Sequence, residues 1–211
     1  MERRGFLGTV SAGMLILAGG SSVSEAMPVE PTVQEPWLEG LSGKHKQYLD
    51  VAAHGQGAPL GRTANLLNAY VESYGLKDSD VNVVFGAHGT AIAMVLDDAL
   101  WSKYTLGSHF SIADPATKSP ALRNIFAGVG KGQGGYTPAL AELQKRGVRF
   151  IACRQAIARL SRELAARDGG DAALINKELL AGLLPGVTGV PAAIVAANRA
   201  QEAGLTYLYI G

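Results

Sequence analysis

The chain has 211 residues, which is the length of one domain or of one domain with an insertion. Hydrophobic residues make up 47% of it and charged residues 18%, so the chain can build a core, and an intrinsically disordered protein is excluded. The formal net charge of +1 excludes a global field that would attract nucleic acid or an acidic membrane surface, and we expect no nucleic-acid partner.

The first 26 residues have the features of an export signal. Arg3 and Arg4 form a twin-arginine pair, a weakly apolar run follows at 10–17, and the tripeptide SEA at 24–26 offers a small-x-small cleavage site. A membrane-spanning helix needs about 20 mostly apolar residues, and this run is shorter and is interrupted by glycines. We therefore expect cleavage, release into the periplasm and no stable membrane span after cleavage.

The first elements of the folded domain follow a segment that has the composition of a linker. Residues 27–44 are rich in Pro, Glu and Ser and show no period, so the domain is expected at 45–211. A short strand is predicted at 48–53. A helix is predicted at 60–74, where apolar residues recur at helical spacing until Gly75.

The middle of the chain combines one clear strand with a long irregular stretch. The β-branched run VNVVFG at 81–86 predicts a buried parallel strand, and 92–104 returns to helical spacing. Residues 106–135 have no clear period, and a loop of this length inside a compact domain tends to be functional. We interpret it as an insertion that covers the site, which makes His109 and Asp114 candidates to close over it.

The second half of the domain alternates strands with helices. Strands are predicted at 148–152, 187–190 and 206–210. Helices are predicted at 137–146, 154–167, 172–183 and 192–203. This alternation indicates an α/β fold with three α/β/α layers, in which a doubly wound, mainly parallel sheet of about five strands carries helices on both faces.

Three reactive side chains come at or just after the ends of predicted strands. His54 follows the first strand, His88 follows the second, and Cys153 follows the third. In sheets of this kind, ligands bind at the carboxyl ends of the strands. We therefore expect these three side chains to lie close together.

Cys153 is the only cysteine of the chain, and it cannot form an internal disulfide in an oxidising compartment. It precedes a predicted helix whose amide dipoles favour a thiolate, and Arg154 adds a positive charge beside it. A thiolate attacks sulfur or holds a persulfide, whereas the alternative is a buried cysteine that acts as a small hydrophobic residue. The position favours the reactive interpretation and leaves the alternative open.

The two histidines have three alternative roles. Each can hydrogen-bond a loop, either can act as a general acid or base near the thiol, and together with Cys153 they can form a metal site of two imidazoles and one thiolate. The three residues are far apart in sequence, so their spacing gives a metal site little support. We predict no cofactor.

The C-terminal half carries a run of recognisable motifs. GVRFIAC at 147–153 is followed by LPGV at 184–187, VPA at 190–192 and QEAGLTY at 201–207. This order, with a cysteine after the strand, resembles the DsrE-like (DsrE/DsrF) family of sulfur-relay proteins, and 81–89 resembles the second strand of that family. The resemblance covers 48–211 and implies a flavodoxin-like three-layer fold, homo-oligomers and sulfur relay through a persulfide on Cys153.

Together these features predict a periplasmic sulfur carrier or sulfurtransferase-like protein. Cys153 would bear the persulfide, Arg154 would stabilise its thiolate, and His54 or His88 would assist proton transfer. The partners would be a sulfur donor or acceptor protein or a small sulfur compound. The alternative is a non-catalytic binding protein that holds a metal or a small ligand at the strand ends.

Overall fold

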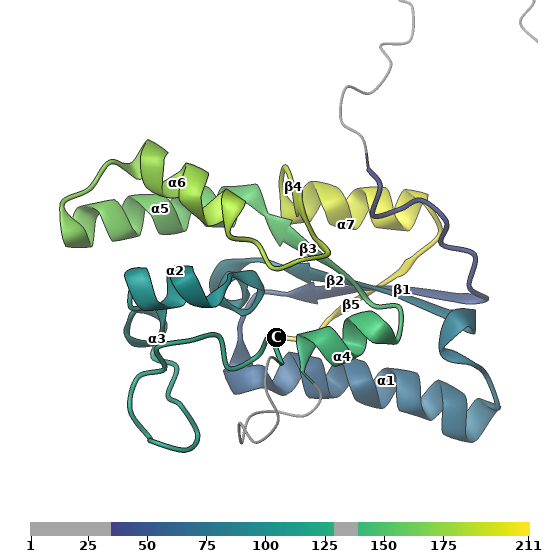
Figure 1. The fold of residues 1–211 in the computed structure, drawn as a ribbon. Helices are drawn as coiled ribbons and strands as arrows, with labels where there is room; N and C mark the ends of the chain where they lie inside the picture. Colours follow the sequence, from purple (N-terminus) through teal and green to yellow (C-terminus); the bar gives the residue numbers. More distant parts are fainter. Residues whose placement is uncertain (1–34, 129–138) are drawn as a thin grey trace, which may run out of the picture. The chain divides into compact units, whose positions relative to one another are not determined.

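The computed structural model of the chain describes residues 35–128 and 139–211. In this part of the chain, five parallel strands form one sheet in the order β4–β3–β2–β1–β5 (Figure 1). The strands are β1 His45–Val51, β2 Val81–Ala87, β3 Arg149–Cys153, β4 Val187–Val190 and β5 Thr206–Tyr209. The predicted α/β fold with a parallel sheet of about five strands is confirmed.

Seven α-helices and three short 3₁₀ helices connect the strands of the described part. The α-helices are α1 Ala58–Tyr74, α2 Asp98–Lys103, α3 Leu106–His109, α4 Leu140–Lys145, α5 Arg154–Asp168, α6 Ala172–Ala181 and α7 Ala193–Glu202. The 3₁₀ helices are η1 Gly55–Gly57, η2 Asp78–Asp80 and η3 Gly89–Val95. None of the described helices has the length and the apolar character that crossing a membrane requires.

The local sequence explains the two best-predicted elements. In β2, Val83 and Val84 point to opposite faces and are both buried, as expected for a strand covered on both sides. In α1, Pro59 occupies the first turn, where its missing N–H costs no helical hydrogen bond. The helix buries Leu67 and ends at Gly75, whose positive φ of 66° suits a residue without a side chain.

Helices cover both faces of the sheet. One face buries Leu49 and Phe85 beneath helices α1 to α6, which all contribute residues to the same hydrophobic core. The other face buries Tyr48 and Ile151 beneath α7 and the segment that contains Trp37. This arrangement confirms the predicted three-layer, doubly wound architecture.

The chain reverses its direction across the sheet once. Strands β1 to β4 step outward in sequence order, and β5 then returns to pair with the other side of β1. Flavodoxin has the order 2-1-3-4-5, so both sheets place β1 second from one edge, although here the edge strand beside it is the last one. Ligands of such sheets bind at the carboxyl ends of the strands near the reversal, which here lies between β1 and β5.

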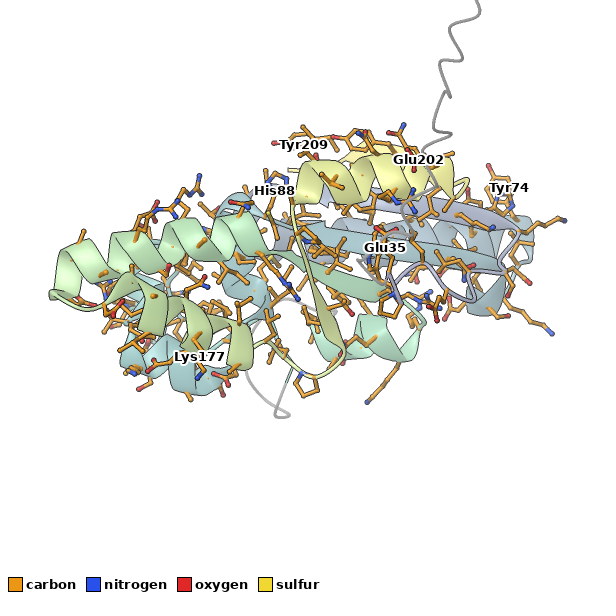
Figure 2. The ribbon with its side chains drawn as sticks, turned by 90° about the horizontal axis from the view of Figure 1, so that it is seen from above. Glu35, Tyr74, His88, Lys177, Glu202 and Tyr209 are labelled. Carbon is orange, nitrogen blue, oxygen red and sulfur yellow. The ribbon has the colours of Figure 1, made fainter. Side chains whose placement is uncertain are left out.

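The helical hairpin of α5 and α6 extends beyond the carboxyl ends of the strands (Figure 1 and Figure 2). Residues 92–104, predicted as one helix, instead form η3 and α2. The break falls at Leu96, which is extended and forms a β-bridge with Leu183, and at Asp97, which accepts a hydrogen bond from the N–H of Leu100 and so begins α2.

The segment predicted as a linker is structured in its described part. Trp37 is only 4% exposed and packs against the α7 face of the sheet. The guanidinium of Arg149 donates hydrogen bonds to the carbonyl oxygens of Pro36, Trp37 and Glu39. The compact unit therefore begins at Glu35 rather than at residue 45, and the predicted signal at 1–26 lies outside the described residues.

Candidate functional site

A cavity of about 580 Å³ opens between the sheet and α7, and it is lined by α7 from its amino end to Gln201. It is lined by Asp50, His88, Cys153, Gln155, Ala192, Ala193, Ile194, Ala197, Asn198, Gln201 and Tyr207. Figure 2 shows His88 beside the amino end of α7. A smaller cavity of about 250 Å³ lies at the amino ends of β1 and β2 and contains none of the predicted site residues.

The polar centre of the large cavity is the carboxylate of Asp50. Leu49 and Val51 point into the larger core, so the alternation of the strand directs Asp50 to the α7 face. One of its oxygens lies 2.7 Å from Nε2 of His88, and the other accepts a hydrogen bond of 2.6 Å from the hydroxyl of Tyr207. Strands β2 and β5 flank β1, and this is why both partners reach one side chain.

The hydroxyl of Tyr207 behaves as a fixed donor. Its hydrogen bond to the carboxylate of Asp50, together with partial burial and the negative charge of Asp50, raises its pKa to about 12. The phenol therefore keeps its proton throughout the physiological range. Tyr207 is 44% exposed, so it forms the outer side of the cavity on the edge strand.

Cys153 forms another part of the cavity wall. It is the last residue of β3 and the N-cap of α5, and no acidic residue occurs in the first turn of that helix. Its residue surface is only 6% exposed. The backbone N–H of Ala193, at the start of α7, donates a hydrogen bond of 3.3 Å to its Sγ atom. The sulfur atom therefore lies at the start of one helix and within hydrogen-bonding distance of the first N–H of another.

Tyr48 supports the wall from behind. Its hydroxyl donates a hydrogen bond of 3.4 Å to the carbonyl oxygen of Ala193, the residue whose N–H faces Cys153. Burial, and next the negative charge of Asp50, raise the pKa of Tyr48 above its ordinary range. The ring lies over Gly86 so closely that a Cβ at that position would be 2.2 Å from the Tyr48 hydroxyl. Glycine is therefore required in β2 to admit this ring.

His54 lies away from the cavity. Its Nδ1 accepts a hydrogen bond from the N–H of Gln56, and its Nε2 lies 3.2 Å from the carbonyl oxygen of Phe110. Burial lowers the pKa of His54, although the hydrogen bond to Phe110 acts in the opposite direction. Both ring nitrogens of His54 therefore hydrogen-bond the backbone of loops. The structure brings His88 and Cys153 to one cavity, and His54 does not line it.

Arg154 does not line the cavity either. Its side chain lies against the backbone of Gly189 in β4, where a Cβ would be 3.2 Å from the guanidinium Nε. The three-residue metal site considered from the sequence is not assembled, because His54 is elsewhere. Across the described residues, no group of three His, Cys, Asp or Glu side chains could hold a metal ion.

The described part of the predicted insertion, 106–128, packs on the larger core and contributes no residue to the cavity. Its Phe126 is fully buried. His109 lies 3.3 Å from the carboxylate of Glu163 on α5, and Asp114 accepts hydrogen bonds within its own turn. Neither closes over Cys153. Residues 129–135 of the insertion lie outside the described residues.

Sequence reasoning missed Asp50 and Tyr207 as site residues. For Asp50 a signal was present, because a carboxylate one residue before the carboxyl end of a buried parallel strand is rarely left without a partner. Tyr207 had no such signal, because only the strand order places β5 beside β1.

Comparison with known proteins assigns no family. No protein-family model matches the chain, and no curated protein matches it. One similar solved structure is a protein of unknown function from Methanobacterium thermoautotrophicum, with 16% sequence identity and a TM-score of 0.41. The match covers 79% of this chain and 99% of that chain. A likeness at this level identifies no function, so the chemistry has to be inferred from the residues of this chain.

Proposed function

We propose that this protein is a sulfur carrier or sulfurtransferase-like protein that holds a persulfide on Cys153. The observation that carries the proposal is the position of Sγ, which lines a cavity of about 580 Å³ and accepts a hydrogen bond from the N–H of Ala193. The resemblance of the C-terminal half to DsrE-like proteins supports the same chemistry. The twin-arginine pattern of Arg3 and Arg4 supports action in the periplasm.

The transfer needs no external oxidant or reductant. The thiolate of Cys153 attacks the outer sulfur of a donor persulfide, R–S–S–H, and a new S–S bond forms on Sγ. The S–S bond of the donor breaks, and its electron pair leaves with the R–S⁻ group, which takes up one proton to become R–SH. The product is Cys153–S–S–H, and the reverse sequence delivers the sulfur to an acceptor thiol.

The dimensions of the cavity favour small partners or the tip of a larger one. A volume of about 580 Å³ admits a low-molecular-weight sulfur compound or a single extended thiol-bearing segment. The uncharged polar side chains of Gln155, Asn198 and Gln201 offer hydrogen bonds to either. The partners are therefore a sulfur donor and acceptor of this kind, and self-association, expected from the resemblance, would be tested by sedimentation of the mature chain.

The test is to load sulfur onto the native protein. The mature chain is incubated with inorganic polysulfide, desalted without reductant, and weighed by intact-mass spectrometry. We expect a gain of one or more sulfur atoms that dithiothreitol removes, and no gain in the Cys153→Ser variant. Absence of any gain in the native wild-type protein, together with a firmly held small molecule or metal, would favour the binding-protein alternative.

A matched control separates the site from the mere presence of a thiol. In the double variant Cys153→Ser/Ser161→Cys, the single cysteine moves to a position in α5 that is 2% exposed and does not line the cavity. This thiol should stay unloaded in the native state and react only after unfolding in urea. Equal loading of the two native proteins would show that the cavity contributes nothing, and the proposal would then be wrong.

A further inference from the structure

The carboxylate of Asp50 holds two donors from two neighbouring strands. His88 Nε2 lies 2.7 Å from one oxygen, and the Tyr207 hydroxyl lies 2.6 Å from the other. Both distances are those of charge-assisted hydrogen bonds, which are about twice as strong as neutral ones. The side chain of Asp50 is 18% exposed, so it is largely shielded from water. This carboxylate is therefore fixed in both position and orientation.

The hydrogen bond decides which nitrogen of His88 carries the proton. An ionised carboxylate is only an acceptor, so Nε2 must donate its N–H to Asp50. In the neutral imidazole, Nδ1 is then the nitrogen with the free lone pair. Over residues 35–128 and 139–211, Nδ1 of His88 forms no hydrogen bond. His88 lines the same cavity as Cys153, and 28% of its side chain is exposed.

We infer that Asp50 is a positioning residue which fixes the tautomer of His88, that Tyr207 holds Asp50 in place, and that Nδ1 of His88 exchanges the proton during sulfur transfer at Cys153. The role in transfer rests on the proposed function, whereas the tautomer does not. In the transfer, Nδ1 accepts the proton of the Cys153 thiol before attack. It returns that proton to the R–S⁻ leaving group, so the imidazole ends each cycle neutral.

Of the groups around the cavity, His88 is the one suited to exchange a proton during sulfur transfer. Tyr207 on β5 and Tyr48 on β1 both have raised pKa values and keep their protons at neutral pH. From α5 and α7, the side chains that line the cavity are uncharged, and Arg154 lies against Gly189 outside it. Histidine is the side chain that exchanges protons near neutral pH, and removing such a general acid or base slows a reaction by about 100- to 10,000-fold.

The first test observes the tautomer directly and needs no activity. A two-bond ¹H–¹⁵N correlation spectrum of the protein labelled at histidine should show His88 in the Nε2–H form above neutral pH. Asp50→Asn should mix the two tautomers, because an amide can accept from or donate to the ring. Asp80→Asn is the matched control, since it removes a carboxylate at the amino end of β2 that, within the described residues, bonds only the backbone N–H of Lys77. A wild-type spectrum with the Nδ1–H form would overturn the inference.

The second test measures the rate of sulfur transfer from glutathione persulfide. We expect His88→Gln to slow loading of Cys153 by about 100-fold and Asp50→Asn by about 10- to 100-fold. The Asp50→Asn/His88→Gln double variant should be no slower than His88→Gln alone, because the two residues act as one unit. Tyr207→Phe should slow loading less than Asp50→Asn, and Asp80→Asn should leave the rate unchanged.

The two tests separate this inference from the proposed function. If the tautomer is as expected but Cys153 never accepts sulfur, the proposed function fails and the Asp50–His88 pair stands. If Cys153 loads at the wild-type rate in Asp50→Asn and in His88→Gln, the sulfur-carrier function stands and the role of the pair in transfer is wrong. Additive effects in the double variant would likewise contradict action as one unit.

Discussion

Replacing Gly86 by Ala tests the closest contact behind the site. A Cβ at this position would lie 2.2 Å from the hydroxyl oxygen of Tyr48 and 2.6 Å from the ring carbon that carries it. Ordinary contacts are about 3.5–4.0 Å, so the ring must move by more than 1 Å. Tyr48 is completely buried beneath α7, so there is no free space into which it can move without displacing its neighbours.

The expected cost combines overpacking with a lost hydrogen bond. Forcing one extra methyl group into a packed core costs about 1–3 kcal/mol, and the bond from Tyr48 to the carbonyl of Ala193 adds about 0.5–1.5 kcal/mol. Each kcal/mol lowers the midpoint of thermal unfolding of a domain of this size by about 2–4 °C. Urea unfolding followed by tryptophan fluorescence measures the free energy.

Gly61→Ala is the matched control. Gly61 lies inside α1 with no atom within 4 Å of its added Cβ, so alanine should stabilise the helix by about 0.5–1 kcal/mol. Tyr48→Leu removes the clashing ring, so Gly86→Ala should cost less in that background than in the wild type. An unchanged free energy of unfolding in Gly86→Ala, with Gly61→Ala stabilising as expected, would refute the contact between Gly86 and Tyr48.

Three further outcomes are expected. Burial lowers the pKa of His54, so its contribution to stability is complete above the unfolded value of about 6.5 and is lost as the pH falls below it. Between about pH 7 and 5, the free energy of urea unfolding should therefore fall less steeply with pH in His54→Gln than in the wild type. An equal slope in the two proteins would contradict this. Asn124→Ala should lower the free energy of unfolding by about 2–4 kcal/mol, because this buried amide hydrogen-bonds three backbone groups, and a loss well below 1 kcal/mol in the urea transition would disagree. The ultraviolet difference titration of wild type against Tyr207→Phe should show a phenol with a pKa of about 12. In the Asp50→Asn background that pKa should return toward about 10, and an unchanged value would remove the hydrogen bond as its cause.

Much of the fold was predictable because its elements are locally consistent. The apolar run of β2 and the helical spacing of α1 up to Gly75 appear in the structure with bounds close to those predicted. The prediction of a single helix at 92–104 was wrong, because a tertiary contact interrupts the helix. The β-bridge between Leu96 and Leu183 holds the backbone extended where helical spacing alone continues.

The candidate site was only partly predictable, and the alternation of side chains explains the difference between the two histidines. His88 follows β2 directly and is still extended, so it continues the alternation in which Gly86 faces Tyr48 and points to the α7 side. His54 comes three residues after β1 ends, where the chain has already turned toward α1. Counting residues from the observed strand ends favours His88, but the first strand was predicted to end two residues too late, at 53, and this concealed the difference. No local pattern, however, places Tyr207 beside Asp50, because strand order is a property of the whole sheet.

The pairing of β5 with β1 also bears on how the protein folds. These two strands are separated by more than 150 residues, whereas β1 and β2 are near neighbours in sequence. Closing a longer loop costs more conformational entropy, so contacts of this kind tend to form after local ones. In refolding experiments, fluorescence of the buried Trp101 would then recover before the phenol of Tyr207 reaches Asp50. The cavity would be completed last, and a short edge strand of four residues would also be the first part to exchange its amide hydrogens with solvent.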